Sequence, residues 1–432
     1  MNGQLQAGTT LMSDANVQYK VVSFLGAGGQ GEVYEVEASG THKALKWYFP
    51  KAALPQQKKI LQRLIEIGTP DDAFLWPEEL INSPDGKTFG YIMPLRPKRF
   101  KGIPDLLKCR VNPSFFTICR TGYNLAKGYE RLHAMGNCYR DINLGNLFFD
   151  PDTGDVRICD CDNVAPKDMG GLVIGTYGFM APEVHRREAN PSRYTDQYSL
   201  AVLLFHLFMV AHPLLGKREA NIKCWDIPAQ DLLYGTHPVF IFDPKDTSNR
   251  PVQGWHDNAL IYWPMYSQEL RDLFTESFTT GLHTPHMRVT EKRWMDAIAN
   301  LMSGICSCPK CGAEVFYDEA KASAGTAQVC WSCRSTVKMP HILTVGRRRA
   351  LLRNGASIPT HQICGNGDME TSIGTVVQNP KNPALTGIRN DSRENWTYIR
   401  SDGTQTPIAP GRSAAIVRGV KIDFGSRIGE IR

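Results

Sequence analysis

The sequence predicts an α+β protein built from several consecutive units, and three observations support this prediction. The N-terminal part favours strands, as in the alternating run 32–37, together with a helical run at 58–67 and a longer apolar helix at 197–210. Two pairs of closely spaced cysteines follow residue 305. Residues 341–432 then return to short alternating runs separated by Gly, Asn, Ser, Thr and Pro, which is typical of a small antiparallel β domain.

Length and composition fit this organisation and exclude some classes of function. The chain has 432 residues, of which 42% are hydrophobic, so we expect two or three domains with a sizeable buried core. Its net charge of +6 is mild, and we interpret the basic clusters 96–101 and 347–349 as solvated surface. We therefore expect no nucleic-acid partner.

The apolar segments and the cysteines argue against a membrane protein or a secreted protein. The longest apolar stretch, Leu200–Val210, is interrupted by His206 and is too short to cross a bilayer. Residues 1–14 lack the basic and apolar regions of a signal peptide. Most of the twelve cysteines occur singly, so reduced thiols are the simpler interpretation. We expect a cytoplasmic protein without a membrane partner.

Asp141 and Asp160 belong to a spaced set of polar groups that phosphoryl transfer requires. Asn146 follows Asp141 by five residues. Two short apolar runs joined by a turn, all within 147–158, then predict a hairpin that leads to Asp160. We therefore expect three groups to meet at one point. The Asp141 carboxylate can orient a hydroxyl, and the Asn146 amide and the Asp160 carboxylate can hold a metal ion.

A glycine-rich stretch near the N-terminus fits the same chemistry. Gly26, Gly28 and Gly31 have the spacing G-x-G-x-x-G, and the alternation at 32–37 predicts that a strand follows, whereas a dinucleotide fingerprint needs a helix. Lys46 arrives about one hairpin later. Alone, the glycines are also compatible with an ordinary hairpin turn and the lysine with a surface residue, so both assignments depend on their place in the series.

In order and spacing, these motifs resemble those of the eukaryotic-like protein kinases. The resemblance implies a two-lobed kinase fold, with an N-terminal lobe at 17–95 after a tail at 1–16 and a C-terminal lobe at 96–304. It also implies ATP as the phosphoryl donor, Mg²⁺ or Mn²⁺ as the metal ion and a protein substrate as the acceptor.

The same resemblance assigns roles to individual residues. Asp141 would orient the acceptor hydroxyl, Asn146 and Asp160 would hold the metal ion, and Lys46 would contact the α- and β-phosphates. Met93 would be the gatekeeper at the end of a buried strand. The implied nucleotide-contacting positions are Gly26, Gly28, Gly31, Val33, Ala44, Lys46, Met93, Leu95 and Phe148.

The resemblance further implies a helix carboxylate as the partner of Lys46. Apolar residues in 58–67 recur on a helical period, which makes Glu66 the candidate. Glu78 and Glu79 are alternatives, although the proline before them favours a loop there.

Three further elements resemble kinase features downstream. Residues 175–183 resemble the end of an activation segment. Asp196, at the start of the helix 197–210, resembles the buried aspartate that ties this helix to the catalytic loop. Arg288 lies where kinases place the arginine that pairs with Glu183.

Several positions depart from the kinase pattern. Asn143 replaces the lysine usually found two residues after the catalytic aspartate, and Cys161 and Asp162 replace the phenylalanine and glycine after the metal-binding aspartate. Tyr139 stands in place of a histidine. Loss of the lysine removes a positive charge from the transferred phosphate, so we expect transfer to be slow or to rely more on metal. For Asp162 we weigh a metal contact against exposure to solvent and favour solvent.

The activation segment lacks phosphorylation sites. Between Asp162 and Gly175 there is no Ser, Thr or Tyr. Thr176 is the nearest hydroxyl, and we expect it to be a structural neighbour of Asp141 rather than a phosphorylated residue. Control by partners, nucleotide or the C-terminal units is the expected alternative.

Four cysteines form two C-x-x-C pairs, separated by 18 residues, that we interpret as a zinc ribbon at 305–340. Because all four ligands would come from the protein, the zinc would be structural. Redox dithiols and coincidental core thiols are the competing interpretations. The four residues are Cys308, Cys311, Cys330 and Cys333.

The unit at 341–432 resembles the second half of a forkhead-associated sandwich, from 388–396 through 422–425. The first half lacks the Gly-Arg and Ser-x-x-His set with which such domains grip phosphothreonine, so the resemblance is to a degenerate member. An oligonucleotide-binding-type barrel is the alternative fold.

The sequences 140–146, 159–163, 196–202 and 212–216, with the cysteine pairs behind them, resemble kinases of the tellurite-resistance-associated phosphorylation triad. That resemblance implies a metal-dependent Ser/Thr phosphatase and a von Willebrand A-type protein as partners. Two functions remain open: an active Ser/Thr kinase, and a nucleotide-binding pseudokinase that recruits partners through its C-terminal units. Retention of the metal and phosphate residues favours the kinase.

Overall fold

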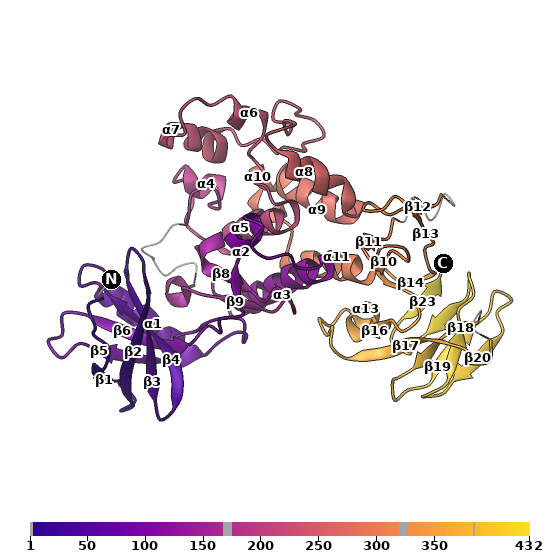
Figure 1. Ribbon diagram of the computed structural model, residues 1–432, viewed down its shortest axis with the longest axis horizontal. Helices are drawn as coiled ribbons and strands as arrows, with labels where there is room; N and C mark the ends of the chain where they lie inside the picture. Colours follow the sequence, from indigo (N-terminus) through magenta and orange to yellow (C-terminus); the bar gives the residue numbers. More distant parts are fainter. Residues whose placement is uncertain (1–2, 167–174, 319–320, 322–325, 383–384) are drawn as a thin grey trace. The chain divides into compact units, whose positions relative to one another are not determined.

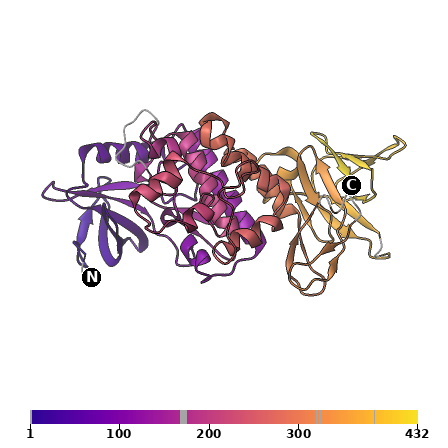
Figure 2. The same cartoon turned by 90° about the horizontal axis from the view of Figure 1, so that it is seen from above.

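The computed structural model describes residues 3–166, 175–318, 321, 326–382 and 385–432 (Figure 1). Strands dominate the indigo and yellow parts of the chain, and helices dominate the part between them (Figures 1 and 2). The chain divides into two compact units. The first contains Met1–Pro113, Asn124–Asp257 and Thr275–Val289, and the second contains Ser114–Tyr123, Asn258–Phe274 and Thr290–Arg432.

The first unit begins with an antiparallel sheet of six strands in the order β1-β2-β3-β4-β6-β5. Side chains alternate along β4, so Leu45 and Trp47 join the core on one face while Ala44 and Tyr48 join the core on the other. The strands are β1 (Thr10–Met12), β2 (Gln18–Ala27), β3 (Gly31–Ala38), β4 (Thr41–Tyr48), β5 (Glu79–Asn82) and β6 (Phe89–Pro94).

Helix α1 (Pro55–Ile67) packs on the second of these faces, where its Leu61 joins the cluster that contains Tyr48. The helix starts three residues before the predicted run at 58–67, because Pro55 occupies a first-turn position where its missing N–H is not needed. Gly68 ends it in a positive-φ conformation.

Helix α5 (Arg193–Met209) is buried along almost all of its length. A capping box between Ser192 and Thr195 fixes its start. A three-stranded sheet in the order β7-β8-β9 carries the loops of the predicted site. Its strands are β7 (Lys101–Gly102), β8 (Leu147–Phe149) and β9 (Val156–Ile158), the last two as the sequence predicts.

Short helical segments complete the first unit. They are α2 (Ile103–Leu107), η1 (Leu144–Asn146), η2 (Cys161–Asn163), α4 (Pro182–His185), α6 (Lys217–Ala220), α7 (Ile227–Gln230), η3 (Asp231–Thr236), α10 (Thr280–His283) and η5 (Pro285–Met287). Three helices, α3 (Phe115–Ala134), α8 (Asp257–Tyr262) and α9 (Gln268–Ser277), have residues in both units.

The second unit contains η4 (Trp263–Met265) and α11 (Glu291–Ser303), followed by two antiparallel hairpins. The first hairpin pairs β10 (Ile305–Ser307) with β11 (Glu314–Phe316), and the second pairs β12 (Gln328–Val329) with β13 (Thr336–Val337). Phe115 of α3 packs on the hairpins, with its ring centroid 5.1 Å from that of Phe316 and 6.0 Å from that of Trp331.

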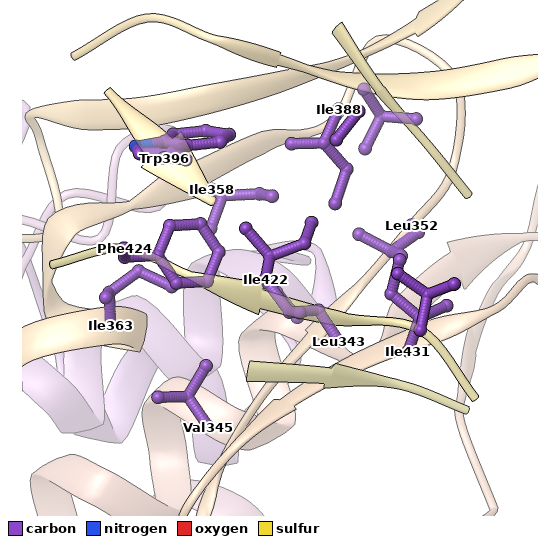
Figure 3. Close-up of a cluster of buried hydrophobic side chains, with 14 of the residues drawn as sticks. Leu343, Val345, Leu352, Ile358, Ile363, Ile388, Trp396, Ile422, Phe424 and Ile431 are labelled. Carbon is purple, nitrogen blue, oxygen red and sulfur yellow. The ribbon is translucent and has the colours of Figure 1, made fainter. Parts of the chain in front are cut away.

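The C-terminal β domain consists of two separate antiparallel sheets, with orders β15-β14-β23-β22-β19-β20 and β16-β17-β18-β21. Both sheets contribute to one core, so the domain is a sandwich and not a closed barrel (Figure 3). Its elements are β14 (Ile342–Val345), β15 (Arg348–Leu351), β16 (Ser357–Pro359), α13 (Thr360–Cys364), β17 (Ser372–Gln378), β18 (Thr386–Asn390), β19 (Trp396–Ile399), β20 (Gln405–Ile408), β21 (Ser413–Ala415), β22 (Lys421–Asp423) and β23 (Ile428–Ile431).

Polar contacts attach this sandwich to the helices of the second unit. The Asn300 side chain donates to the carbonyl of Arg347 at 2.9 Å and accepts from the N–H of Arg349 at 2.9 Å. The Gln362 amide donates to the carbonyl of Ala299 at 3.0 Å. The β domain is therefore part of a compact unit and not a separate module on a tether.

Within the described part of the chain, no helix combines the length and apolarity that crossing a bilayer would need.

Candidate functional site

A cavity of about 810 Å³ in the first unit collects the residues that the sequence singled out. It is lined by the β2–β3 turn, β4, the end of β6 and the loops around β8 and β9. All predicted nucleotide-contacting residues and three predicted catalytic or metal-binding residues border it. They are Gly26, Gly28, Gly31, Val33, Ala44, Lys46, Met93, Leu95 and Phe148, with Asp141, Asn146 and Asp160.

The three glycines at the β2–β3 turn and the strand ends beside it differ in why they lack a side chain. A Cβ atom on Gly31 would lie 2.2 Å from the carbonyl oxygen of Trp47, so the approach of two strands requires glycine there. By contrast, Gly26 and Gly28 have no heavy atom within 4 Å of such a position. Packing therefore does not require glycine at these two positions. The absence of side chains there leaves more room in the cavity that they border.

Asp196 of α5 holds the backbone just before Asp141, in the segment that we call the catalytic loop. Its buried carboxylate accepts hydrogen bonds from the backbone N–H groups of Tyr139 at 2.6 Å and Arg140 at 2.9 Å, and it lies 3.0 Å from Nε2 of His133. Arg140 has φ +75°, a conformation that non-glycine residues rarely adopt without such support. This geometry matches the role that the kinase resemblance gave to Asp196.

The loop residues after Asp141 are held by side-chain amides. Asn143 and Asn146 each donate to the carbonyl oxygen of Asp141, at 3.0 and 3.1 Å. The Asp141 carboxylate accepts a 2.6 Å hydrogen bond from the hydroxyl of Thr176, as the sequence suggested for that neighbour. Asn143 also donates to the Thr176 hydroxyl at 3.2 Å, so it binds neighbouring groups where a lysine would supply charge.

Asn146 and Asp160 fit the donor set of a Mg²⁺ or Mn²⁺ ion. Both border the cavity, and the Asn146 nitrogen is committed to Asp141, which leaves the amide oxygen available. Asp160 has φ +52°, and its side chain is 44% exposed. Burial of the surrounding site raises the pKa of Asp160, and the nearby ammonium group of Lys46 opposes this shift, as a bound cation would.

Glu66 is not the partner of Lys46, which corrects the assignment made from the helical period. Glu66 is exposed in the last turn of α1, nine residues after the buried Gln57 and therefore about 180° around the helix from it. The two alternatives are also engaged elsewhere. Glu78 pairs with Lys43 at 2.8 Å, and Glu79, which opens β5 rather than a loop, accepts from the Tyr19 hydroxyl at 3.1 Å.

The charged partners of Lys46 are two aspartates of the loop after β9, which we call the metal-binding loop for the role predicted for Asp160. Its ammonium nitrogen lies 2.8 Å from Oδ2 of Asp162 and 3.2 Å from Oδ1 of Asp160. Burial alone would lower the pKa of Lys46, but the two carboxylates outweigh burial and raise this pKa above its ordinary value. Asp162 is fully buried, so the interpretation that it faces solvent was wrong.

Tyr48 and Gln57 also donate hydrogen bonds to Asp162. The hydroxyl of Tyr48 donates to Oδ2 of Asp162, and the Gln57 amide donates to its backbone carbonyl at 2.6 Å. Burial, followed by the Asp162 charge, raises the pKa of Tyr48 well above its usual value. Sequence reasoning missed both residues, although Tyr48 shares a strand face with Lys46 and Gln57 is a polar residue in an apolar helical stripe.

Glu183 and Arg288 form the ion pair that the resemblance suggested. The guanidinium group donates two hydrogen bonds of 2.8 Å to the carboxylate, one from each terminal nitrogen. It also donates to the carbonyls of Gly281 and Tyr194, each at 2.9 Å. The pair ties α4, at the end of the activation segment, to the loop before α11.

The second unit contains a four-cysteine cluster at the turns of its two hairpins. One ligand atom from each cysteine lies within 4.8 Å of every other, with Sγ–Sγ distances of 3.6 Å for Cys308–Cys333 and 3.7 Å for Cys311–Cys330. All four thiols are free rather than disulfide-bonded. A tetrahedral zinc ion with ligands at about 2.3 Å separates its sulfurs by about 3.8 Å, so the arrangement fits zinc.

Comparison with known proteins identifies a family similarity in the part of the chain that contains Asp141, Asn146 and Asp160. Residues 106–296 match the family model of the protein kinase domain. The chain is 31% identical over 107 residues to ribosomal protein S6 kinase alpha-4 of Mus musculus, covering 24% of this chain and 14% of that protein. It is 25% identical over 304 residues to protein kinase YegI of Escherichia coli K12, covering 66% of this chain and 45% of the relative.

A plant relative and a solved structure extend the comparison. The probable serine/threonine-protein kinase PBL26 of Arabidopsis thaliana is 25% identical over 236 residues, covering 50% of this chain and 55% of that protein. The chain thus spans about half or less of the length of these curated relatives. The PknI kinase domain of Mycobacterium tuberculosis aligns with 18% identity and a TM-score of 0.44, covering 68% of this chain and 97% of that one. Residues 106–296 are thus similar to a protein kinase domain, and relatives of the chain include a bacterial protein kinase and a probable Ser/Thr kinase.

Proposed function

We propose that the chain is an active ATP-dependent Ser/Thr protein kinase that transfers the γ-phosphate to protein hydroxyls with Mg²⁺ or Mn²⁺. The observation that carries this proposal is the single cavity bordered by Lys46, Asp141, Asn146 and Asp160 beneath the glycine-rich turn. These are the groups that positioning, metal binding and hydroxyl activation require.

Each residue has a defined part in the proposed reaction. Asp141 orients the acceptor hydroxyl and takes up its proton as the oxygen attacks the γ-phosphorus and the bond to the β–γ bridging oxygen breaks, which releases ADP. Lys46 contacts the α- and β-phosphates. Asn146 and Asp160 would hold the metal ion, which when bound offsets charge on the phosphates.

The neutral side chain of Asn143 leads us to expect a slow rate of phosphoryl transfer. The amide of Asn143 binds Thr176 and the Asp141 backbone and supplies no positive charge to the transferred phosphate. Electrostatic stabilisation of the transition state is therefore weaker than it would be with a lysine, and we expect slow transfer that depends strongly on metal.

A nucleotide-binding pseudokinase is the alternative function. The neutral residue at position 143 favours it, as does the compact attachment of the hairpins and the β sandwich in the second unit, which would provide a surface for partners. In this case the cavity would bind nucleotide for structural reasons and the second unit would do the recruiting.

The C-terminal modules add further proposals. We assign the four-cysteine cluster to a structural zinc ribbon, supported by the sulfur spacing. We interpret the sandwich as a degenerate forkhead-associated domain that recruits partners, of which a metal-dependent Ser/Thr phosphatase and a von Willebrand A-type protein are the candidates. We propose a cytoplasmic location.

Transfer of radiolabelled phosphate decides between kinase and pseudokinase. The purified chain is incubated with γ-labelled ATP and Mg²⁺ or Mn²⁺, beside Asp141→Ala prepared in the same way. Label incorporated into Ser or Thr by the native chain and lost in Asp141→Ala supports the kinase. Equal label in both proteins, or none with intact nucleotide binding, would favour the pseudokinase.

A further inference from the structure

Lys46 takes its buried counter-ion from the metal-binding loop and not from helix α1. We infer that Asp162 is the positioning residue for Lys46, so that the lysine and the metal-binding Asp160 are assembled by one loop without a helix carboxylate. This inference rests on the proposed nucleotide-binding and kinase function.

The two aspartates that contact Lys46 differ in their surroundings. The Asp160 side chain is 44% exposed and borders the cavity, whereas the Asp162 side chain is fully buried and does not border it. A metal ion in the cavity would therefore bind Asp160 and leave Asp162 paired with the lysine. Asp162 is the partner that remains when nucleotide and metal are bound.

A buried lysine needs such a partner. Only 5% of Lys46 is exposed, and a buried ammonium group without an anion is strongly unfavourable. If Asp160 were the sole anion, the lysine and the metal ion would compete for the same carboxylate. Asp162 removes this competition, because its Oδ2 lies 2.8 Å from the lysine nitrogen.

Neighbouring groups hold Asp162 in this position. The Tyr48 hydroxyl, on the same strand face as Lys46, donates to Oδ2, which fixes the side chain. The Gln57 amide of α1 donates to the Asp162 backbone carbonyl at 2.6 Å. Helix α1 therefore contributes a neutral amide to this cluster.

The location of the charge has a consequence for regulation. In an arrangement with a helix carboxylate, outward movement of the helix removes the counter-ion of the lysine. Here, movement of α1 would break the contact of Gln57 and leave the Lys46–Asp162 pair in place. The phosphate-binding lysine is thus independent of helix position, and control has to act elsewhere.

Asp162→Asn tests the inference, because it removes the charge and keeps the shape. We measure the KM for ATP, kcat and the Mg²⁺ concentration at half-maximal rate, together with ATP binding by calorimetry with and without Mg²⁺. We expect the KM for ATP and the required Mg²⁺ concentration each to rise about tenfold, since Lys46 is then drawn to Asp160. Glu66→Gln is the matched control and should leave all of these quantities unchanged.

A double-mutant cycle separates positioning from general stability. If Asp162 acts through Lys46, Asp162→Asn should lose its effect on MgATP affinity in a Lys46→Met background. An equal loss of affinity in both backgrounds would overturn the inference, as would an unchanged KM and Mg²⁺ requirement in Asp162→Asn, or a loss in Glu66→Gln of similar size.

Tyr48→Phe keeps the test decisive if Asp162→Asn does not fold. It removes one hydrogen bond to Oδ2 and leaves both charges, so we expect a two- to threefold loss of MgATP affinity, which corresponds to about 0.5 kcal/mol. This loss should disappear in the Lys46→Met background. Full persistence in that background would contradict the inference. Because binding is measured without turnover, native chain that binds MgATP but transfers no phosphate would refute only the proposed activity.

Discussion

The hydroxyl of Thr176 donates a hydrogen bond of 2.6 Å to the carboxylate of Asp141. This contact connects the end of the activation segment to the catalytic loop without any phosphate group. Asn143 strengthens the connection, since its amide lies 3.2 Å from the same hydroxyl. The sequence contains no hydroxyl side chain between Asp162 and Gly175. Residues 167–174 of this segment lie outside the described residues.

We predict that phosphorylation of Thr176 is not an activating switch. A phosphate there would put about two negative charges beside Asp141 and repel both this carboxylate and ATP. Treatment with a Ser/Thr phosphatase should therefore leave the transfer rate unchanged, with phosphate content followed by mass spectrometry. A large loss of activity that maps to dephosphorylated Thr176 would contradict this prediction.

Variants at the same position test the hydrogen bond itself. Thr176→Val keeps the side-chain size but removes the donor, so kcat should fall about tenfold because Asp141 is less well oriented. Thr176→Ser retains the hydroxyl and is the matched control, with activity close to that of the native chain. The KM for ATP should not change in either variant.

Asp141 and Asp160 should differ in their effect on nucleotide binding. We predict that Asp160→Ala abolishes the Mg²⁺-dependent part of ATP affinity, because it removes the carboxylate of the metal site. Asp141→Ala should leave affinity nearly intact and remove transfer. Calorimetric titration with ATP, with and without Mg²⁺, measures the difference, and equal losses of affinity in the two variants would refute the assigned roles.

Spacing in the sequence predicts the position of a site residue where short loops and turns connect the elements that carry it. The hairpin β8–β9 brings Asp160 to the cavity that Asp141 and Asn146 border, because few residues separate them and the turn leaves little freedom. Asp196 could be placed for a similar reason, since it opens a long buried helix. These residues were accessible to sequence reasoning because local geometry determines their positions.

The partner of Lys46 could not be found in this way. Its contact with Asp162 spans 116 residues, and the sequence gives no register between β4 and the metal-binding loop. The helical period predicts the run 58–67, in which Glu66 is the only carboxylate, whereas the helix face that meets Asp162 carries Gln57, one residue before this run. The burial of Asp162 is a tertiary property and follows only from the packing of three elements around it.

Removal of zinc should unfold the hairpin unit. We predict a single zinc ion per chain by elemental analysis, and loss of that zinc with increased aggregation in Cys308→Ser and Cys330→Ser, because metal binding and folding of so small a unit are coupled. Cys364→Ser is the control, since this exposed cysteine lies outside the cluster. Native protein that is metal-free yet well folded would contradict the zinc assignment.

Loss of the Arg288 guanidinium should destabilise the first unit. Arg288→Ala would leave the carboxylate of Glu183 without its ion pair and two carbonyls without a donor, which costs about 3–5 kcal/mol for a buried pair of this kind. Chemical denaturation measures the free energy of unfolding. The exposed Lys51→Ala is the control and should change it by less than about 0.5 kcal/mol.

Asn300 should be important for the attachment of the β sandwich to α11. Its side chain contacts the carbonyl of Arg347 in the turn between β14 and β15 and the N–H of Arg349 in β15, so it takes the place of a strand partner for this edge strand. Asn300→Ala would leave these partly buried backbone groups without their side-chain partner, and we expect a loss of about 1–2 kcal/mol in the free energy of unfolding. Asn354→Ala, at an exposed position of the same domain, is the matched control.

Limited proteolysis reports the attachment directly, because the β domain of Asn300→Ala should be cleaved from the chain faster than that of the native protein and of the control. Equal cleavage rates in all three proteins, with unchanged stability, would show that other contacts hold the sandwich to the helices.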